Sequence, residues 1–212
     1  MTFEELAASH EPTLDRLALA VAAEFREVDE AAALDRLDML AAELTPGPAP
    51  VEQGDAIAAL LGGRHGFVGN EAHYDHPDNS MLDLVLERRT GLPILLSTVY
   101  VEVARRNGIP LHGVGLPGHF VVGHFGVEPP LFYDPFDGGS RIELEAPEEL
   151  IRPWRPQETA LRILNNLVAS FGKHGDLGNA IRAAELRLLL PMEVDSYTEL
   201  EADLRSHRAR LN

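Results

Sequence analysis

The sequence predicts an α+β protein in which a buried central helix packs on a small antiparallel sheet. One observation is an apolar stripe with the i, i+3, i+4, i+7 spacing of a helix, at Leu96, Val99, Tyr100 and Val103. The other is the run of short apolar segments between residues 111 and 144, separated by turns that are too short for a parallel crossover. A helix that covers one face of such a sheet gives the α+β layer arrangement.

The central elements follow one another closely. The helix is expected to end at Asn107-Gly108, with Pro110 beyond it, which is a typical C-terminal signal. The turn Pro117-Gly118 separates the first two strands. The strands are predicted over residues 112–116, 120–125, 131–133 and 141–144.

Helices are also predicted before the central stretch. Two amphipathic helices are expected over Pro12–Phe25 and Glu30–Leu44. Thr45–Gly54 is rich in proline and is predicted to be a loop, followed by a short helix over Asp55–Leu61 that ends at Gly62-Gly63. Residues 62–80 are expected to be irregular, and a helix is expected from Met81 to Arg89.

The C-terminal part is predicted to be helical again. Leu161–Pro191 reads as helix, tight turn and helix, and it resembles one tetratricopeptide-type hairpin. Because one such hairpin does not bury its own apolar face, we expect it to dock on the central part. The predicted organisation is therefore an N-terminal helical segment (1–54), a core (55–152) and a C-terminal helical segment (153–212), which together form one compact unit.

Composition narrows the classes of function. The formal net charge of −16, from 18 Lys and Arg against 34 Asp and Glu, argues against nucleic-acid partners and anionic membranes. The chain has no cysteine, which excludes thiol catalysis and cysteine metal sites. We see no signal peptide and no membrane-spanning run, and expect a cytoplasmic protein. The sequence does not predict an oligomeric state.

Three polar residues come from three successive predicted elements. Ser97 lies in the first or second turn of the central helix, His119 lies on a strand, and Asp134 ends another strand. This is the layout of a nucleophile, a base and a residue that orients the base. The start of a helix also supplies free N–H groups, which stabilise a developing negative charge. Each residue also has a purely structural interpretation. Ser97 could hydrogen-bond the first turn of its helix, His119 could hold the strands together in the core, and Asp134 could cap a turn.

Longer motifs resemble a known family. The segments TGLPILLSTVYVEVARRNGIP, GVGLPGHFVV and YDPFDGG are similar to those of the SirB-type family of bacterial transglutaminase-like proteins. The resemblance implies a transglutaminase-like (cysteine-proteinase-type) core, with helices before it and a tetratricopeptide-like segment after it. It also implies that a Cys–His–Asp set falls on Ser97, His119 and Asp134, with serine in place of cysteine.

This substitution changes the chemistry that we expect. A serine hydroxyl forms no resting ion pair with histidine and has to lose its proton during attack. Our first hypothesis is therefore a non-catalytic regulatory scaffold that binds a protein or peptide through its pocket or its C-terminal helices. The alternative is a Ser–His–Asp hydrolase or acyl-transfer enzyme that acts on amide or ester bonds.

Other features point to weaker hypotheses. Residues 62–80 contain three histidines and two aspartates, and they either cover the pocket or sense a metabolite or a metal. His112 and His124 could join His119 in a metal site, although we expect neither a metal nor a cofactor. Four arginines (Arg88, Arg89, Arg105 and Arg106) are read as solvated helix ends.

Overall fold

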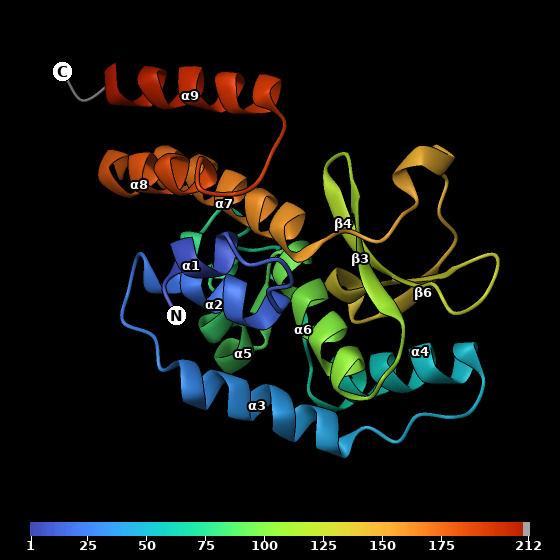
Figure 1. The fold of residues 1–212 in the computed structure, drawn as a ribbon. Coiled ribbons are helices and arrows are strands. Elements are labelled where there is room, and N and C mark those ends of the chain that lie inside the picture. The colour runs from blue at the N-terminus through green and yellow to red at the C-terminus, as the bar shows by residue number, and fades with distance from the viewer. Residues whose placement is uncertain (210–212) are drawn as a thin grey trace.

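The computed structural model describes residues 1–209 (Figure 1). The N-terminal helices are α1 (Phe3–Ala7), α2 (Leu14–Ala23) and α3 (Glu30–Glu43). The predictions for α2 and α3 are accurate to within two residues. The short helix α1 was not predicted. Its N-terminus is capped by a capping box between Thr2 and Glu5, and its apolar residues are buried.

The proline-rich segment after α3 is not a loop throughout. Helix α4 (Pro50–Ala58) begins inside it, because Pro50 occupies the first turn, where a missing N–H costs nothing. The Glu52 carboxylate also accepts a hydrogen bond from the N–H of Ala49 (3.1 Å). The prediction of a loop through Gly54 was therefore wrong from Pro50 onward. Proline was read there only as a helix breaker.

The next segment is also more regular than predicted. Helix α4 continues into the π-helix η1 (Ala59–Arg64), so the helix does not stop at Gly62-Gly63. Gly62 packs so closely against the carbonyl group of Gly138 that a side chain at this position has no room. The remaining elements up to the central helix are β1 (Val68–Gly69), the 3₁₀ turn η2 (Pro77–Ser80), α5 (Leu82–Arg88) and β2 (Thr90–Gly91).

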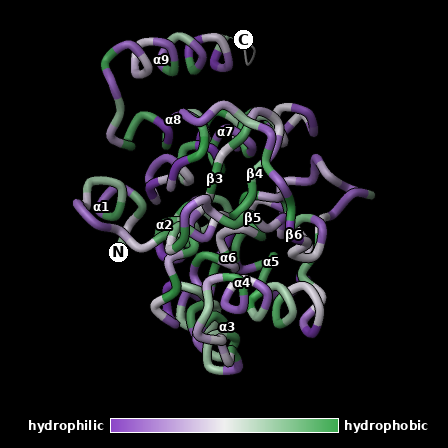
Figure 2. The backbone as a smooth tube through the Cα atoms, turned by 90° about the vertical axis from the view of Figure 1, so that its right-hand side faces the viewer, coloured by the Kyte–Doolittle hydropathy of each residue, from purple (hydrophilic) through white to green (hydrophobic). Residues whose placement is uncertain are grey.

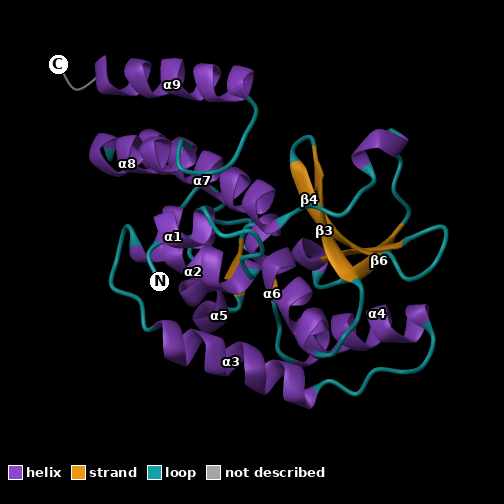
Figure 3. Cartoon of the chain, viewed as in Figure 1, coloured by secondary structure: helices purple, strands orange, loops and turns teal. Residues whose placement is uncertain are grey.

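The central helix α6 spans Pro93–Arg106 and packs on an antiparallel sheet (Figure 3). The sheet has the order β3-β4-β5-β6, and each strand pairs with the next along the chain. Its strands are β3 (Leu111–Leu116), β4 (His119–His124), β5 (Leu131–Asp134) and β6 (Ser140–Ile142), with the 3₁₀ turn η3 (Pro135–Asp137) between the last two. The α+β prediction is confirmed.

The C-terminal helices form a layer above α1 and α2 in the view of Figure 1. After the turn η4 (Glu148–Leu150), they are α7 (Pro156–Lys173), α8 (Leu177–Arg187) and α9 (Val194–Ala209). Helices α7 and α8 pack as an antiparallel pair, and α7 also packs on α2. Helix α7 also reaches the β3–β4 hairpin, where Arg162 Nη2 donates to the carbonyl oxygen of Leu116 (3.4 Å). The hydrophobic stretches gather in the central elements, whereas α9 is mostly hydrophilic (Figure 2). No helix within residues 1–209 is both long and apolar enough to cross a membrane.

A buried ionic network ties α2 and α3 to the end of α6. The Arg106 guanidinium contacts the carboxylates of Asp15 (2.7 Å), Glu102 (2.7 Å) and Asp38 (2.6 Å). Arg106 is only 14% exposed, so the prediction of a solvated helix end is wrong for this residue. Arg105 joins the same carboxylates of Asp15 and Glu102, because both arginines follow Glu102 by about one helical turn.

The contact between Gly62 and Gly138 gives a test of the fold. We expect Gly62→Ala to lower the free energy of unfolding by about 2 kcal/mol, because the added methyl group meets a backbone carbonyl that has little freedom to move. The control is Gly63→Ala, where a methyl group meets nothing within 4 Å. Urea denaturation of both variants measures the difference, and equal stabilities would contradict this account.

Candidate functional site

A histidine and an aspartate from neighbouring strands form a close pair. His119 begins β4 and Asp134 ends β5, and His119 Nε2 lies 2.7 Å from Asp134 Oδ2. The other carboxylate oxygen of Asp134 accepts a hydrogen bond from the N–H of Phe136 (2.9 Å). This bond caps the start of the turn η3. The ring of Phe136 stands edge-on to His119, with ring centroids 6.4 Å apart. The pair is thus held from both sides.

The pairing sets the proton arrangement of His119. The hydrogen bond to Asp134 is the main reason that the pKa of His119 lies above its ordinary value, although partial burial acts in the opposite direction. Because Nε2 faces the carboxylate, Nδ1 is the nitrogen that remains for a nucleophile or a ligand.

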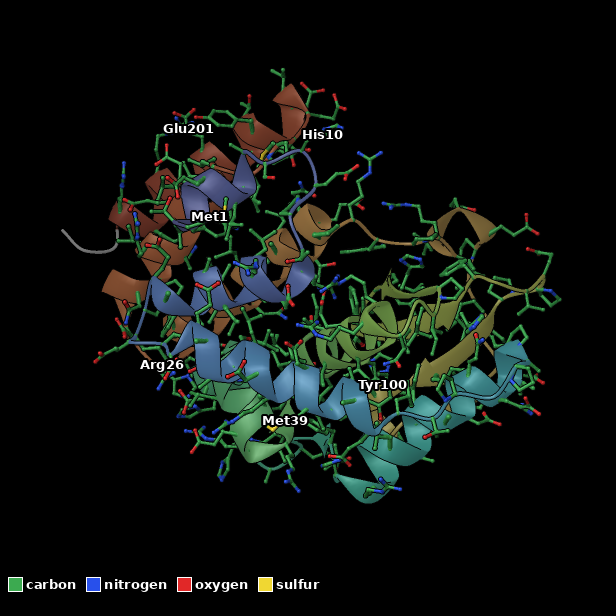
Figure 4. All side chains as sticks on the ribbon, turned by 60° about the horizontal axis from the view of Figure 1, so that its bottom comes forward. Met1, His10, Arg26, Met39, Tyr100 and Glu201 are labelled. Atoms are coloured by element: carbon green, nitrogen blue, oxygen red, sulfur yellow. The ribbon has the colours of Figure 1, made fainter. Side chains whose placement is uncertain are left out.

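Ser97 does not join this pair by a hydrogen bond. It is the fifth residue of α6 and is 0% exposed, and its hydroxyl has no hydrogen-bond partner within residues 1–209. Tyr100 lies one turn further along α6, where that helix approaches α4 (Figure 4), and its hydroxyl is likewise without a partner in the described chain. The structure therefore brings His119 and Asp134 into contact and leaves Ser97 inside the core.

A small cavity of about 30 Å³ lies beside His119. The residues that line it come from the loop before η2, the start of α6, the β3–β4 hairpin and α7: Tyr74, Pro93, Ile94, Gly118, His119, Phe120, Arg162 and Asn166. The wall supplied by α6 is thus made by Pro93 and Ile94, in its first turn, and not by Ser97. No serine, threonine or cysteine is among these lining residues, and neither is any carboxylate.

A buried asparagine holds the loop that carries Tyr74. Asn79 Nδ2 donates to the carbonyl oxygens of His73 (2.6 Å) and Tyr74 (3.1 Å), and its Oδ1 accepts from Asn70 Nδ2 (3.0 Å). The carbonyl oxygen of Asn79 accepts from the N–H of Leu92, the residue that caps α6 (3.1 Å). One residue thus fixes the Tyr74 loop and the start of α6 relative to each other.

Tyr74 also lines a second, larger depression of about 460 Å³. This groove lies between the loop of residues 71–76 and the end of α7, which contributes Lys173 and His174. Lys173 forms an ion pair with Asp75 across it, and the rings of His76 and His174 lie 5.7 Å apart. Residues 62–80 therefore contribute a wall to both depressions.

The described residues do not assemble the ligands that the two metal-site hypotheses require, either in residues 62–80 or among the strand histidines. Residues 1–209 contain no group of three or more His, Cys, Asp or Glu side chains that could hold a metal ion. His124 instead shares a hydrogen bond with Gln53 Oε1 (2.9 Å) and accepts one from the N–H of Gly126 (3.2 Å). His119 is engaged by Asp134, so His119 and His124 have separate hydrogen-bond partners.

Comparison with known proteins identifies the family. The family model described as the transglutaminase-like superfamily matches residues 13–167. The chain belongs to this superfamily. The matched region of this transglutaminase-like protein starts near the beginning of α2 and reaches into α7. It therefore includes every residue that lines the cavity beside His119.

Individual relatives cover smaller parts of the chain. A UPF0162 protein of Xylella fastidiosa (strain 9a5c) is 37% identical over 153 residues, which are 64% of this chain and 54% of the relative. F-box only protein 21 of Mus musculus is 43% identical over 68 residues, which are 32% of this chain and 11% of that protein. The chain thus spans about half the length of the UPF0162 proteins of Xylella fastidiosa.

A solved structure shares the fold. The crystal structure of menin matches 98% of this chain and 60% of its own chain, with a TM-score of 0.58. Because the two sequences are only 13% identical, the match shows a likeness of fold alone.

Sequence reasoning missed several residues of the transglutaminase-like site. Tyr74 lies in a segment without periodicity, and only the general expectation that residues 62–80 cover the pocket pointed to it. Arg162 and Asn166 are one turn apart on α7, a spacing that places them on the same face of the helix. That spacing could have been read from the sequence, but the prediction of a separate C-terminal segment directed attention away from it.

The His119–Asp134 pair predicts a pH effect. The raised pKa means that the protonated form of His119 favours folding. This contribution is fully present below the ordinary histidine pKa and is lost as the pH rises through the raised value. We expect Asp134→Asn to lower the pKa of His119, while the remaining amide oxygen still accepts from Phe136. An NMR titration of the His119 ring measures this, with His112 as the internal control. An unchanged pKa of His119 would contradict the assigned cause.

The Asn79 network predicts a second effect. Asn79→Asp replaces an N–H donor with an oxygen that faces two carbonyl groups, so we expect a loss of about 2 kcal/mol of stability. Amide hydrogen exchange should accelerate in residues 70–76. The control is Asn165→Asp, which keeps the oxygen that accepts from Arg187. If amide exchange in residues 70–76 is the same in the two variants, Asn79 does not hold the loop that carries Tyr74.

Proposed function

We propose that this transglutaminase-like protein is a non-catalytic member of its superfamily that binds a protein or peptide partner beside His119. The observation that carries the proposal is the absence of a serine, threonine or cysteine among the residues that line the cavity with His119. Acyl transfer needs a nucleophile within hydrogen-bond reach of its base, at about 2.6–3.2 Å. The start of α6 offers Pro93 and Ile94 instead.

The position of Ser97 supports the same conclusion. Its hydroxyl is fully buried and touches no described polar group, so a substrate carbonyl has no path to it in this conformation. The retained His119–Asp134 pair is then a binding and structural element. When the imidazole is protonated, Nδ1 donates a hydrogen bond to a ligand while Asp134 accepts from Nε2.

Similar folds support a role in protein recognition. The crystal structure of menin reveals the binding site for the Mixed Lineage Leukemia (MLL) protein, and this chain shares the fold of menin over 98% of its own length. From menin we carry over to this chain only the proposal that the fold binds a protein, and not the identity of the partner. We also assign the chain to the SirB-type branch and α7–α8 to the tetratricopeptide type. These two assignments rest on the sequence motifs, and the cytoplasmic location expected from the sequence is carried forward as a proposal.

Peptide selection tests the binding proposal. A random peptide library displayed on phage is selected on the purified protein, and synthetic copies of enriched peptides are measured by fluorescence anisotropy. We expect Asn166→Trp to abolish binding, because the bulky ring fills the cavity beside His119. Ala169→Trp is the matched control, since Ala169 lies on the exposed face of the same helix. The proposal fails if no peptide is enriched, or if enriched peptides bind both variants equally.

A reactive probe separates this proposal from the serine hydrolase alternative. We expect a fluorophosphonate probe to give no more labelling of the wild type than of Ser97→Ala, with a serine protease in parallel as the positive control. The Ser97→Ala change removes an unpartnered buried hydroxyl, so stability should stay the same or rise by up to about 1 kcal/mol. Labelling that requires both Ser97 and His119 would establish the hydrolase instead.

A further inference from the structure

Arg162 is a half-buried arginine that lines a cavity in an acidic chain. Several arginines on or near α7 and α8 pair with carboxylates, as in Arg152–Glu158, Arg182–Glu24 and Arg187–Asp203, each at 2.6 Å, whereas the exposed Arg155 has no such ion pair among the described residues. Within residues 1–209, Arg162 forms no ion pair. Its one hydrogen bond there runs from Nη2 to the carbonyl oxygen of Leu116, at 3.4 Å. Most of its five N–H donors are therefore unused.

Its neighbours in the cavity are also mainly hydrogen-bond donors. Nδ1 of His119 donates when the imidazole is protonated, since Asp134 accepts from Nε2, and Asn166 adds the N–H donors of a side-chain amide one turn after Arg162 on α7. The backbone N–H of Ile94 belongs to the first turn of α6, where a helix leaves its donors without internal acceptors. No carboxylate lines the cavity, although acidic residues outnumber basic ones by 34 to 18. A partly buried cation without a counter-ion thus faces a space that holds one small group.

We infer that Arg162 and His119 together bind a carboxylate of a peptide, which comes from a chain terminus or from an acidic side chain. This inference rests on the proposed binding function and names the group that is recognised. A guanidinium binds a carboxylate through parallel N–H donors, and such charge-assisted hydrogen bonds are the strong ones. The cavity of about 30 Å³ is small, which suits a compact end group such as a carboxylate.

The surroundings indicate how the rest of the peptide lies. Tyr74 lines both the cavity and the groove of about 460 Å³ between residues 71–76 and the end of α7. A chain that lies in this groove brings its carboxylate past Tyr74 to Arg162. Asp134 forms no ion pair with Arg162 in the described part of the chain, and its two oxygens accept from His119 and from the N–H of Phe136.

Small probes test this inference by NMR on the full chain. N-acetylglycine carries a terminal carboxylate, N-acetylaspartate α-methylamide carries a side-chain carboxylate, and N-acetylglycinamide carries none. We expect at least one carboxylate probe to shift the side-chain signals of Arg162 and His119 in a saturable way, and the amide not to do so. Arg162→Gln should weaken this binding by about tenfold or more. Arg155→Gln, which changes an exposed arginine at the start of α7, should leave it unchanged.

The outcomes separate the inference from the function on which it rests. Saturation by only one carboxylate probe supports the inference and identifies the source as a chain terminus or a side chain. Equal binding of the amide probe, equal affinity in Arg162→Gln, or inorganic phosphate that binds as well as the carboxylates would overturn it. If display-selected peptides still bind the cavity and resist Arg162→Gln, the carboxylate inference fails and the binding function stands. If neither peptides nor probes bind, both fail.

Discussion

The burial of α6 on all sides is the constraint around which this structure is built. Eleven of its fourteen residues are buried, including polar residues such as Ser97, Thr98 and Glu102. A helix without a solvent face needs cover from several directions, and the sheet, α3, α2 and α7 each supply part of it. The charged end of α6 is neutralised by Asp15 and Asp38 from the N-terminal helices. Segments far apart in the sequence therefore meet at one helix.

The same helix determines what the site contains. Its first turn lies beside His119, which pairs with Asp134, and the side chains that it contributes to the cavity, Pro93 and Ile94, are hydrocarbons. These two side chains have no acid–base chemistry. In the role that we propose, the donors that α6, β4 and α7 place beside His119 recognise an acceptor group and do not cleave a bond.

Local patterns predicted most of the fold. The helices α2, α3 and α6 and the sheet strands follow from periodicity and turn residues, and the His119–Asp134 pair follows from the family motif. The start of α4 at Pro50 was missed because proline was read only as a helix breaker, whereas the continuation of η1 through Gly62 depends on a close contact with a distant segment. Gly54 lies against Tyr133, and Gly62 lies against Gly138. Sequence spacing also could not show that Ile94, rather than Ser97, lines the cavity with His119, since this depends on how α6 is rotated against the sheet.

The packing of α7 has a thermodynamic consequence. The helix belongs to the hydrophobic core through residues such as Leu164 and Leu167, and it also supplies one wall of the cavity through Arg162 and Asn166. A molecule held there contacts two parts of the chain that local unfolding of the C-terminal helices would separate. Mass action then couples occupancy of the cavity to the docking of those helices, so a bound partner slows their opening and a loosened α7 weakens the partner.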